Sequence, residues 1–519
     1  MKKNTPVHPM SEATSAISRP GRLVLLCLLP LLLTGCGGSG RTGGLALSPA
    51  EFYSLEAFDP AIQAAALAPA GGPPPRASSL PEYRIELEIA ADLTSYRGSE
   101  TITLPNTTGS PVAGVGFLLL PELTGGSLQV LAVRRGPAAL EFSAKAGICS
   151  VSLGEPLPPG QATALQLDFA GRVPSSLRNP GIFLSSRRSV SLGGFYPALL
   201  PLRPGGGWTA SRPKASHGDP PAVMPGNYLV RFSAPASLRF AASGLLGKAK
   251  QEGDRKTFLA VSGPVREFYL CGSETWRRLS IRKQGIRINS YYPRDSRLPG
   301  INALYYAADA LRIFERRFGP YPYTELDVVS APLGSQGLGM EYPGIIVLSD
   351  ELYNPQGRLG LFGADYIQEG TTAHEVAHQW FYNLVGSDPV EEPWLDEAFA
   401  QYCTWLYFST IRGERAGNPF YTSLENRWAR IRRKPLPIGL PARAYSSRDY
   451  SAIIYGRAPL FLFDLIRIGG QEKFDSLVTQ YIDRYRWGQA DSKGFHRMLT
   501  TFYPLHGEEL FRKWVLPEE

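Results

Sequence analysis

The spacing of hydrophobic residues changes once along this chain, and this change constrains the fold more than any other feature. Between residues 81 and 277 apolar and polar residues alternate within short runs, as in the segment YRIELEI at 83–89. Strict alternation is typical of a strand with one buried face. Beyond residue 277 apolar residues recur at intervals of three and four, as at 301–318, which is typical of amphipathic helices. We therefore expect a β region followed by a mainly helical one.

The first region contains further strand-like runs separated by Gly, Pro and Asn, at 128–133, 164–169, 228–232 and 258–261. We interpret residues 81–277 as one N-terminal all-β domain of packed antiparallel strands. No cluster of titratable side chains is apparent in it, so we expect it to support and shape a site and not to supply chemistry. Residues 278–519 are predicted to form a mainly helical domain with a small sheet, because 321–350 resembles strands around a Gly-rich turn.

The N-terminus has the pattern of an export signal. Four basic residues precede the apolar run at 23–33, which is too short to span a bilayer and fits a secretory signal peptide. The run ends in LTGC, which resembles the bacterial lipobox, so Cys36 is predicted to carry a lipid. We expect a signal peptide at 1–35, a Gly/Pro-rich tether at 36–80 and a protein anchored to a bacterial membrane. The alternative is an ordinary signal peptide in which Cys36 is incidental.

Charge and cysteine content bear on possible binding partners and on possible disulfides. Without residues 1–35, which hold four basic and one acidic side chain, the formal net charge falls from +8 to +5, which is mild for a chain this long. No basic stripe interleaved with aromatic residues indicates a nucleic-acid partner. Beyond Cys36 the predicted mature chain has Cys149, Cys271 and Cys403. An exported location permits a disulfide, and Cys149 with Cys271 is one such pairing because both fall in the predicted β domain.

The segment HEVAH at 374–378 is the strongest chemical signal in the chain. His374 and His378 are separated by four residues and would lie one turn apart on one face of a helix predicted at 371–385. There they can hold a single Zn²⁺ through their ring nitrogens, while Glu375 acts as general base toward a water. Apolar residues cover the other faces of this helix, and a buried helix would not present two histidines without partners.

A catalytic zinc site of this kind needs a third protein ligand. Glu397, nineteen residues beyond His378, lies at the start of another predicted helix and is well placed for that role. Glu391, Glu392 and Asp396 are rival ligands, and they are also candidates for outer partners of the zinc ligands.

These residues resemble the M1 zinc aminopeptidases, also called gluzincins. The family signature is HExxH, eighteen residues and then Glu, with that Glu inside a segment similar to WLNEGFA. The chain matches the spacing, and its WLDEAFA at 394–400 differs only at Asp396 and Ala398. The resemblance covers most of residues 81–519. It implies Glu397 as the third zinc ligand and a β-rich N-terminal domain followed by a thermolysin-like catalytic domain.

Two further family motifs have partial matches. LGMEY at 338–342 resembles the GAMEN strand, and the resemblance implies that Glu341 binds the free α-amine of a peptide, with Gly339 and Met340 beside the substrate. Leu338, Gly339 and Tyr342 depart from the motif. YGRA at 455–458 resembles the family's YEKG, which implies that Tyr455 donates a hydrogen bond to the oxyanion of the tetrahedral intermediate. Tyr450 is the local rival.

The departures from the family pattern have consequences for specificity. No clear equivalent of the family's amine-binding glutamine in the N-terminal domain is present, and 191–196 occupies roughly that region. The chain ends at Glu519, soon after the predicted catalytic domain, so we expect no large helical C-terminal domain and a more open cleft.

The predicted function is a zinc-dependent aminopeptidase that removes N-terminal residues from peptides outside the cytoplasm. The first alternative is an endopeptidase, or a hydrolase of a non-peptide substrate, that uses the same zinc site. A more remote alternative is an inactive peptide-binding surface lipoprotein. Such a protein would be expected to lose Glu375 or a zinc ligand, and the chain retains them all.

Overall fold

The computed structural model describes residues 66–68, 79–175, 182–211, 217–333, 337–354, 358–359, 362–431 and 436–517. They all belong to one compact unit, Leu47–Glu519. The predicted signal peptide, Cys36 and nearly all of the predicted tether lie outside the described residues. None of the helices in these ranges combines the length and hydrophobicity that a bilayer span requires.

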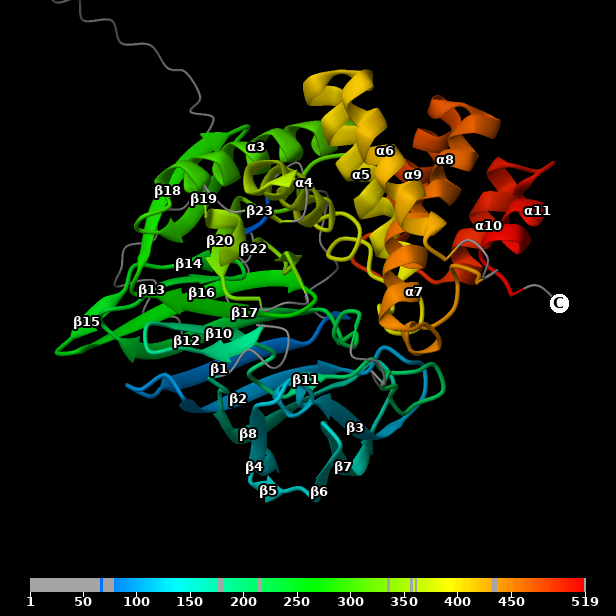
Figure 1. Ribbon diagram of the computed structural model, residues 1–519. Coiled ribbons are helices and arrows are strands. Elements are labelled where there is room, and N and C mark those ends of the chain that lie inside the picture. Colours follow the sequence, from blue (N-terminus) through cyan, green and yellow to red (C-terminus); the bar gives the residue numbers. More distant parts are fainter. Residues whose placement is uncertain are drawn as a thin grey trace, which may run out of the picture. The chain divides into compact units, whose positions relative to one another are not determined.

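A β-sandwich forms the N-terminal part of the described chain (Figure 1). In spatial order its largest sheet contains β14 (Leu245–Leu246), β16 (Arg255–Val265), β12 (Gly226–Pro235), β1 (Glu82–Ile89), β2 (Ser95–Pro105), β8 (Ala162–Arg172), β4 (Ser127–Arg135) and β5 (Ala138–Ala139), with β15 (Lys250–Glu252) paired to β16. A second sheet contains β13 (Arg239–Ala242), β17 (Tyr269–Ser273), β10 (Ser189–Gly193) and β9 (Phe183–Ser185). A third contains β11 (Ala198–Leu199), β3 (Val112–Leu118), β7 (Ile148–Leu157) and β6 (Phe142–Lys145), and the 3₁₀ turn η3 (Leu120–Leu123) follows β3.

Alternation places the side chains of these strands as the sequence predicts. In β1 the side chains of Tyr83, Ile85, Leu87 and Ile89 are buried, whereas the intervening charged residues are exposed. The prediction of an all-β N-terminal domain is confirmed. Most pairs are antiparallel, but β1 pairs with β12 in parallel. Alternation specifies which face of a strand is buried and carries no information on strand direction.

Aromatic residues fill the sandwich core next to a buried acid. Tyr83 stacks on Tyr228 with ring centroids 4.5 Å apart, and the Tyr196 hydroxyl donates to that of Tyr228 at 3.0 Å. Glu100 on β2 points into the same core and is 1% exposed. Cys149, Cys271 and Cys403 are buried free thiols, so the pairing of Cys149 with Cys271 is not present.

Helices dominate the remainder of the described chain, as predicted. They are α3 (Arg297–Phe318), α4 (Ala364–Ala377), α5 (Trp394–Arg412), α6 (Glu414–Ala429), α7 (Ser447–Ala452), the π-helix η7 (Ile453–Arg457), α8 (Ala458–Gly469), α9 (Gln471–Tyr485), α10 (Ser492–Phe502) and α11 (Gly507–Trp514), with 3₁₀ turns η5 (Asp350–Tyr353) and η6 (Ala442–Ala444). The small mixed sheet has the order β18 (Trp276–Lys283), β19 (Ile286–Pro293), β20 (Glu325–Ala331), β22 (Ile345–Ser349) and β21 (Gly339–Met340), and β23 (Arg358–Leu359) pairs with β24 (Phe362–Gly363). The domain boundary near residue 277 remains a prediction.

The helix that carries HEVAH differs in extent from the prediction of 371–385. It begins earlier, at Ala364, and ends at Ala377, with His378 as its C-cap. Apolar spacing continues to residue 385, but the backbone leaves the helix, and Tyr382 has a positive φ of 134°. Phe381 instead stacks on Phe399 of α5, with ring centroids 4.5 Å apart. Packing between α4 and α5 therefore overrides the local helical pattern.

Candidate metal centre

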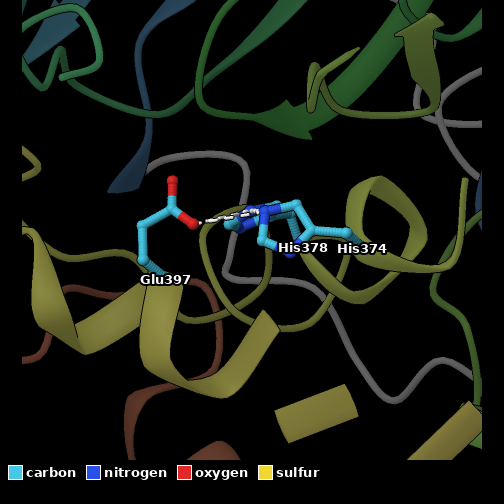
Figure 2. A group of neighbouring side chains, drawn as sticks. All are labelled: His374, His378 and Glu397. Carbon is cyan, nitrogen blue, oxygen red and sulfur yellow. Dashed lines mark hydrogen bonds and ion pairs between the residues drawn. The ribbon is translucent and has the colours of Figure 1, made fainter. Parts of the chain in front are cut away.

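The two histidines lie at the C-terminal end of α4, on the same side of the helix. His374 is in its last turn, and His378 keeps a right-handed helical backbone (φ −63°, ψ −13°). The i, i+4 relation therefore survives although the helix ends between them. Their Nε2 atoms are 3.2 Å apart. Both imidazoles are directed toward one point, as Figure 2 shows.

Glu397 reaches that point from the first turn of α5. The stacking of Phe381 on Phe399 holds this end of α5 against the turn after α4. The backbone N–H of Glu397 donates to Asp396 Oδ1 at 2.7 Å. Glu397 Oε2 lies 3.2 Å from His374 Nε2 and 3.8 Å from His378 Nε2 (Figure 2). Packing between the helices thus brings a carboxylate opposite two ring nitrogens.

The distances between these three atoms fit a tetrahedral zinc ion. Ligands about 2.0–2.1 Å from a tetrahedral zinc lie about 3.3 Å from one another. The three separations here are 3.2, 3.2 and 3.8 Å. Glu397 Oε2 is buried, and apart from the two imidazole nitrogens it has no polar partner among the described residues. Two nitrogens and one such oxygen form the His₂Glu set of catalytic zinc sites, which leaves a fourth position for water or substrate.

Outer partners orient both imidazoles for metal binding. His378 Nδ1 lies 2.9 Å from the Phe381 carbonyl, so Nδ1 carries the proton and Nε2 has a free lone pair. The side-chain amide of Gln401 on α5 lies 3.4 Å from His374 Nδ1. An amide turned so that its oxygen faces Nδ1 would accept the Nδ1 proton and would likewise leave Nε2 free.

The surroundings of the ligands favour the protonation states that metal binding requires. Burial lowers the pKa of His378 to about 4, against the opposing effect of Glu397, so the ring is neutral near neutral pH. Burial alone would raise the pKa of Glu397, but the contact with the His374 imidazole and the hydrogen bond from the Tyr455 hydroxyl oppose burial and lower it. A neutral imidazole and an ionised carboxylate are the forms that bind zinc.

The rival ligands are engaged elsewhere. Glu391 forms an ion pair with Arg443. Glu392 accepts a hydrogen bond from the backbone N–H of Ser492 at 2.9 Å. Asp396 accepts the backbone N–H of Glu397 with Oδ1, and it does not belong to either group of converging ligand atoms found among the described residues. Glu397 is therefore the acidic member of the metal set.

Glu375 and Glu341 lie beside His378. The carboxylates of Glu341 and Glu375 and a ring nitrogen of His378 form a group of atoms within 4.8 Å of one another. Burial raises the pKa of each acid well above its usual value, and neighbouring carboxylates raise it further. Gly339 lies against the Glu375 carboxyl, where an added Cβ would come within 2.1 Å of Oε1. Met340 is half-buried on the same strand, β21.

Tyr455 lies in the π-helix η7 and points to the metal position. Its hydroxyl donates to Glu397 Oε1 at 2.5 Å. Pro459 cannot donate the N–H that an α-helix would direct to the carbonyl of Tyr455, and such a loss favours a local π turn. Gly456 lets α6 approach closely, because an added Cβ would lie 2.9 Å from the Trp428 backbone nitrogen. Tyr450, the rival, is buried with its ring centroid 6.0 Å from that of Tyr455.

Two acids from the β region lie near this centre and were missed by the sequence reasoning. Burial, with the charges of Glu397 and Glu267, raises the pKa of Asp219 to about 7. Glu267 accepts a hydrogen bond from the Tyr382 hydroxyl at 2.5 Å. A signal for Glu267 exists, since Arg266 and Glu267 interrupt an apolar run at 258–271. No local pattern indicates Asp219, which precedes two prolines in a loop.

Comparison with curated proteins relates the helical region to aminopeptidases. Residues 302–514 match the family model described as the peptidase family M1 domain. The alanine/arginine aminopeptidase of Saccharomyces cerevisiae is 30% identical over 194 residues, 36% of this chain and 22% of that protein. Aminopeptidase 2 of Candida albicans is 26% identical over 201 residues, 37% of this chain and 22% of that protein. The chain thus spans about a fifth of the length of these relatives.

Comparison with solved structures covers most of the chain. The M1 zinc metallopeptidase from Deinococcus radiodurans superposes with a TM-score of 0.64 at 22% identity, covering 84% of this chain and 94% of that one. A mutant of that protein bound to a Tyr-Ser-Ala substrate has the same score, identity and coverage. A two-domain M1 zinc metallopeptidase mutant bound to L-arginine superposes at 0.65 with 21% identity, covering 85% of this chain and 94% of that one. The likeness shows a shared fold.

The three converging ligands and the match to the family model indicate the same metal site. His374, His378 and Glu397 form the single zinc site typical of M1 peptidases, as predicted. All three residues lie within the segment that matches the family model. Residues 302–514 therefore match the peptidase family M1 domain, and the chain shares its fold with solved M1 zinc metallopeptidases.

Proposed function

We propose that this protein is an aminopeptidase that removes N-terminal residues from peptides. The observation that carries the proposal is the position of Glu341, whose carboxylate lies within the same 4.8 Å group as Glu375 and His378. A buried acid at this distance from the metal position can bind the α-ammonium of a peptide as an ion pair. It would thereby place the first peptide bond, and not an internal one, over the metal position.

The residues around the metal position support each step of hydrolysis. Zinc, when bound by His374, His378 and Glu397, supplies a Lewis acid and acidifies a water. Glu375 accepts a proton from the attacking water, and it later delivers the proton to the leaving amine. The raised pKa of Glu375, caused first by burial and then by Glu397 and Asp219, suits a group that must both take and give a proton.

Tyr455 supplies the remaining polar contact. Its hydroxyl lies 2.5 Å from Glu397 Oε1, the second oxygen of the metal-binding carboxylate, and we place it within reach of a substrate carbonyl oxygen at the metal position. We assign it to stabilise the oxyanion that forms as the carbonyl carbon becomes tetrahedral.

The proposal is tested with a matched pair of peptides, one with a free N-terminus and one N-acetylated. We expect cleavage of the free peptide only, because acetylation removes the charge that Glu341 binds. A chelator should abolish cleavage and added Zn²⁺ should restore it. Equal cleavage of both peptides would instead favour the endopeptidase alternative. A Glu375→Gln variant is the control, with zinc retained in metal analysis and turnover reduced by about 10²–10⁴-fold.

We also propose that the protein is exported and anchored to a bacterial membrane by a lipid on Cys36. The apolar run at 23–33, the LTGC segment that ends at Cys36 and the Gly/Pro-rich segment after it support this. A Cys36→Ala variant should move from the membrane fraction to the soluble fraction. Mass spectrometry of the mature N-terminal peptide should find an acylated cysteine in the unaltered protein, and an unmodified Cys36 would contradict the proposal.

A further inference from the structure

A pocket lies beside the metal centre, between the β-sandwich and strand β21. Glu341 lines this pocket and also belongs to the group of ligand atoms around the metal position. The walls are mainly apolar and include Leu118, Leu120, Val223 and Met340. A peptide whose α-amine binds Glu341 has its first side chain attached one atom away. This pocket is therefore the space that the first side chain would enter.

Besides Glu341, one further carboxylate, Glu267, interrupts the apolar wall. Glu267 lies in the connection between β16 and β17 and is partly exposed, to the pocket that it lines. Its Oε2 accepts a hydrogen bond from the Tyr382 hydroxyl at 2.5 Å. Among the described residues no hydrogen bond reaches Oε1. The carboxylate thus has one fixed donor and one open oxygen.

The adjacent arginine does not neutralise Glu267 by direct contact. The guanidinium of Arg266 donates to the backbone carbonyls of Tyr382 and Gly488. In the described part of the chain no ion pair within 4.0 Å joins Arg266 to Glu267. Burial accordingly raises the pKa of Glu267 to about 7, although the Tyr382 hydrogen bond and the charge of Arg266 oppose the rise. Asp219 nearby adds further negative charge.

We propose that Glu267 selects a cationic N-terminal side chain, lysine or arginine, for the aminopeptidase activity proposed above, on which this inference rests. The methylene stem of such a side chain packs along the apolar wall, and its head group reaches the open oxygen of Glu267. The charge-assisted hydrogen bond supplies the close counterion that the carboxylate lacks. The Tyr382 hydroxyl holds the carboxylate toward the lumen.

The test compares two pairs of aminoacyl fluorogenic substrates. Lysine is compared with norleucine, which lacks only the terminal ammonium group, and arginine is compared with citrulline, which has the same length and no charge. We expect kcat/KM of the zinc-loaded protein to favour the charged member of each pair by about 10-fold, as one charge-assisted hydrogen bond provides. In Glu267→Gln both ratios should fall to about 1, through loss on the charged substrates, while leucine and norleucine substrates keep their rates.

A matched control is Glu315→Gln. Glu315 is a partly buried acid at the end of α3 that accepts the backbone N–H of Tyr321 at 3.1 Å and does not line the pocket. It should keep the ratios of the unaltered protein. A measurement that needs no variant is inhibition of leucine-substrate cleavage, for which L-lysinamide should be stronger than L-norleucinamide by a similar factor.

These experiments distinguish failure of the Glu267 proposal from failure of the proposed aminopeptidase function. Unchanged ratios in Glu267→Gln, or cleavage of norleucine and leucine substrates with no preference for lysine and arginine, would overturn the role of Glu267 and leave the aminopeptidase assignment intact. Failure to cleave any substrate with a free N-terminus would overturn the proposed function, and the role of Glu267 with it.

Discussion

At the scale of single residues, the metal centre depends on three side-chain atoms that converge because each is oriented by a second group. The Phe381 carbonyl orients His378, Gln401 lies against His374, and Tyr455 donates to Glu397. Such outer partners hold ligands at metal-binding distance. Of these three outer partners, Tyr455 is the one that we also expect to act in catalysis.

We predict that Tyr455→Phe lowers kcat by about 10²–10³-fold with little change in KM, because the oxyanion loses a donor that matters most in the transition state. Steady-state kinetics on a free-amine peptide measure this, and metal analysis should find one zinc per chain. Tyr450→Phe is the control, since the Tyr450 hydroxyl has no hydrogen-bond partner among the described residues. A larger loss in Tyr450→Phe than in Tyr455→Phe would reverse the assignment.

At the scale of elements, strand β2 has an acid on its buried face. Neither carboxyl oxygen of Glu100 has a hydrogen-bond partner within the described residues. Burial raises its pKa well above the usual value, so the folded protein holds Glu100 protonated where the unfolded chain ionises it. The stability that Glu100 contributes is fully present below the unfolded pKa. It is lost as pH rises from there through the folded pKa, by about 1.4 kcal/mol per pH unit.

We therefore predict that Glu100→Gln removes this pH dependence. Thermal unfolding between pH 5 and pH 9 should show Tm of the unaltered protein falling relative to that of the variant as pH rises. Glu88→Gln on the neighbouring strand β1 is the control, because the Glu88 side chain is 52% exposed and pairs with Arg97. Parallel pH profiles for Glu100→Gln and the unaltered protein would contradict the prediction.

At the scale of the whole molecule, Arg266 joins the β-sandwich to two distant parts of the helical region. Its guanidinium donates to the carbonyl of Tyr382, after α4, and to that of Gly488, after α9. The guanidinium packs on Gly386, where an added Cβ would come within 2.2 Å of it. Arg266 is 7% exposed, so its removal takes a charged donor from both carbonyls in a buried setting, and only the Gly488 carbonyl keeps a backbone donor, the Gly386 N–H at 3.1 Å.

We predict that Arg266→Ala lowers the free energy of unfolding by about 3 kcal/mol, since hydrogen bonds to a charged group contribute about 1.5–3 kcal/mol each. Urea unfolding measures the change. Arg97→Ala provides the comparison, because the Arg97 side chain is 77% exposed and its ion pair with Glu88 should contribute less than about 1 kcal/mol. Equal losses in the two variants would show that Arg266 does not couple the two regions.

The sequence alone determined the features that depend on local geometry. Helical spacing predicted that His374 and His378 share one face. Alternation predicted which residues of β1 and its neighbours are buried. These predictions hold because the period of a helix or strand places side chains without reference to the rest of the chain.

Only the tertiary structure decided the features that depend on packing between distant segments. The end of α4 at Ala377, the parallel pairing of β1 with β12, and the approach of Asp219 and Glu267 to the metal centre have no periodic signal. Asp219 and Glu267 come from loops whose positions are set by contacts across the sandwich and the helices. Zinc chemistry could therefore be predicted from the sequence, whereas the pocket that would distinguish one N-terminal side chain from another forms only when the chain folds.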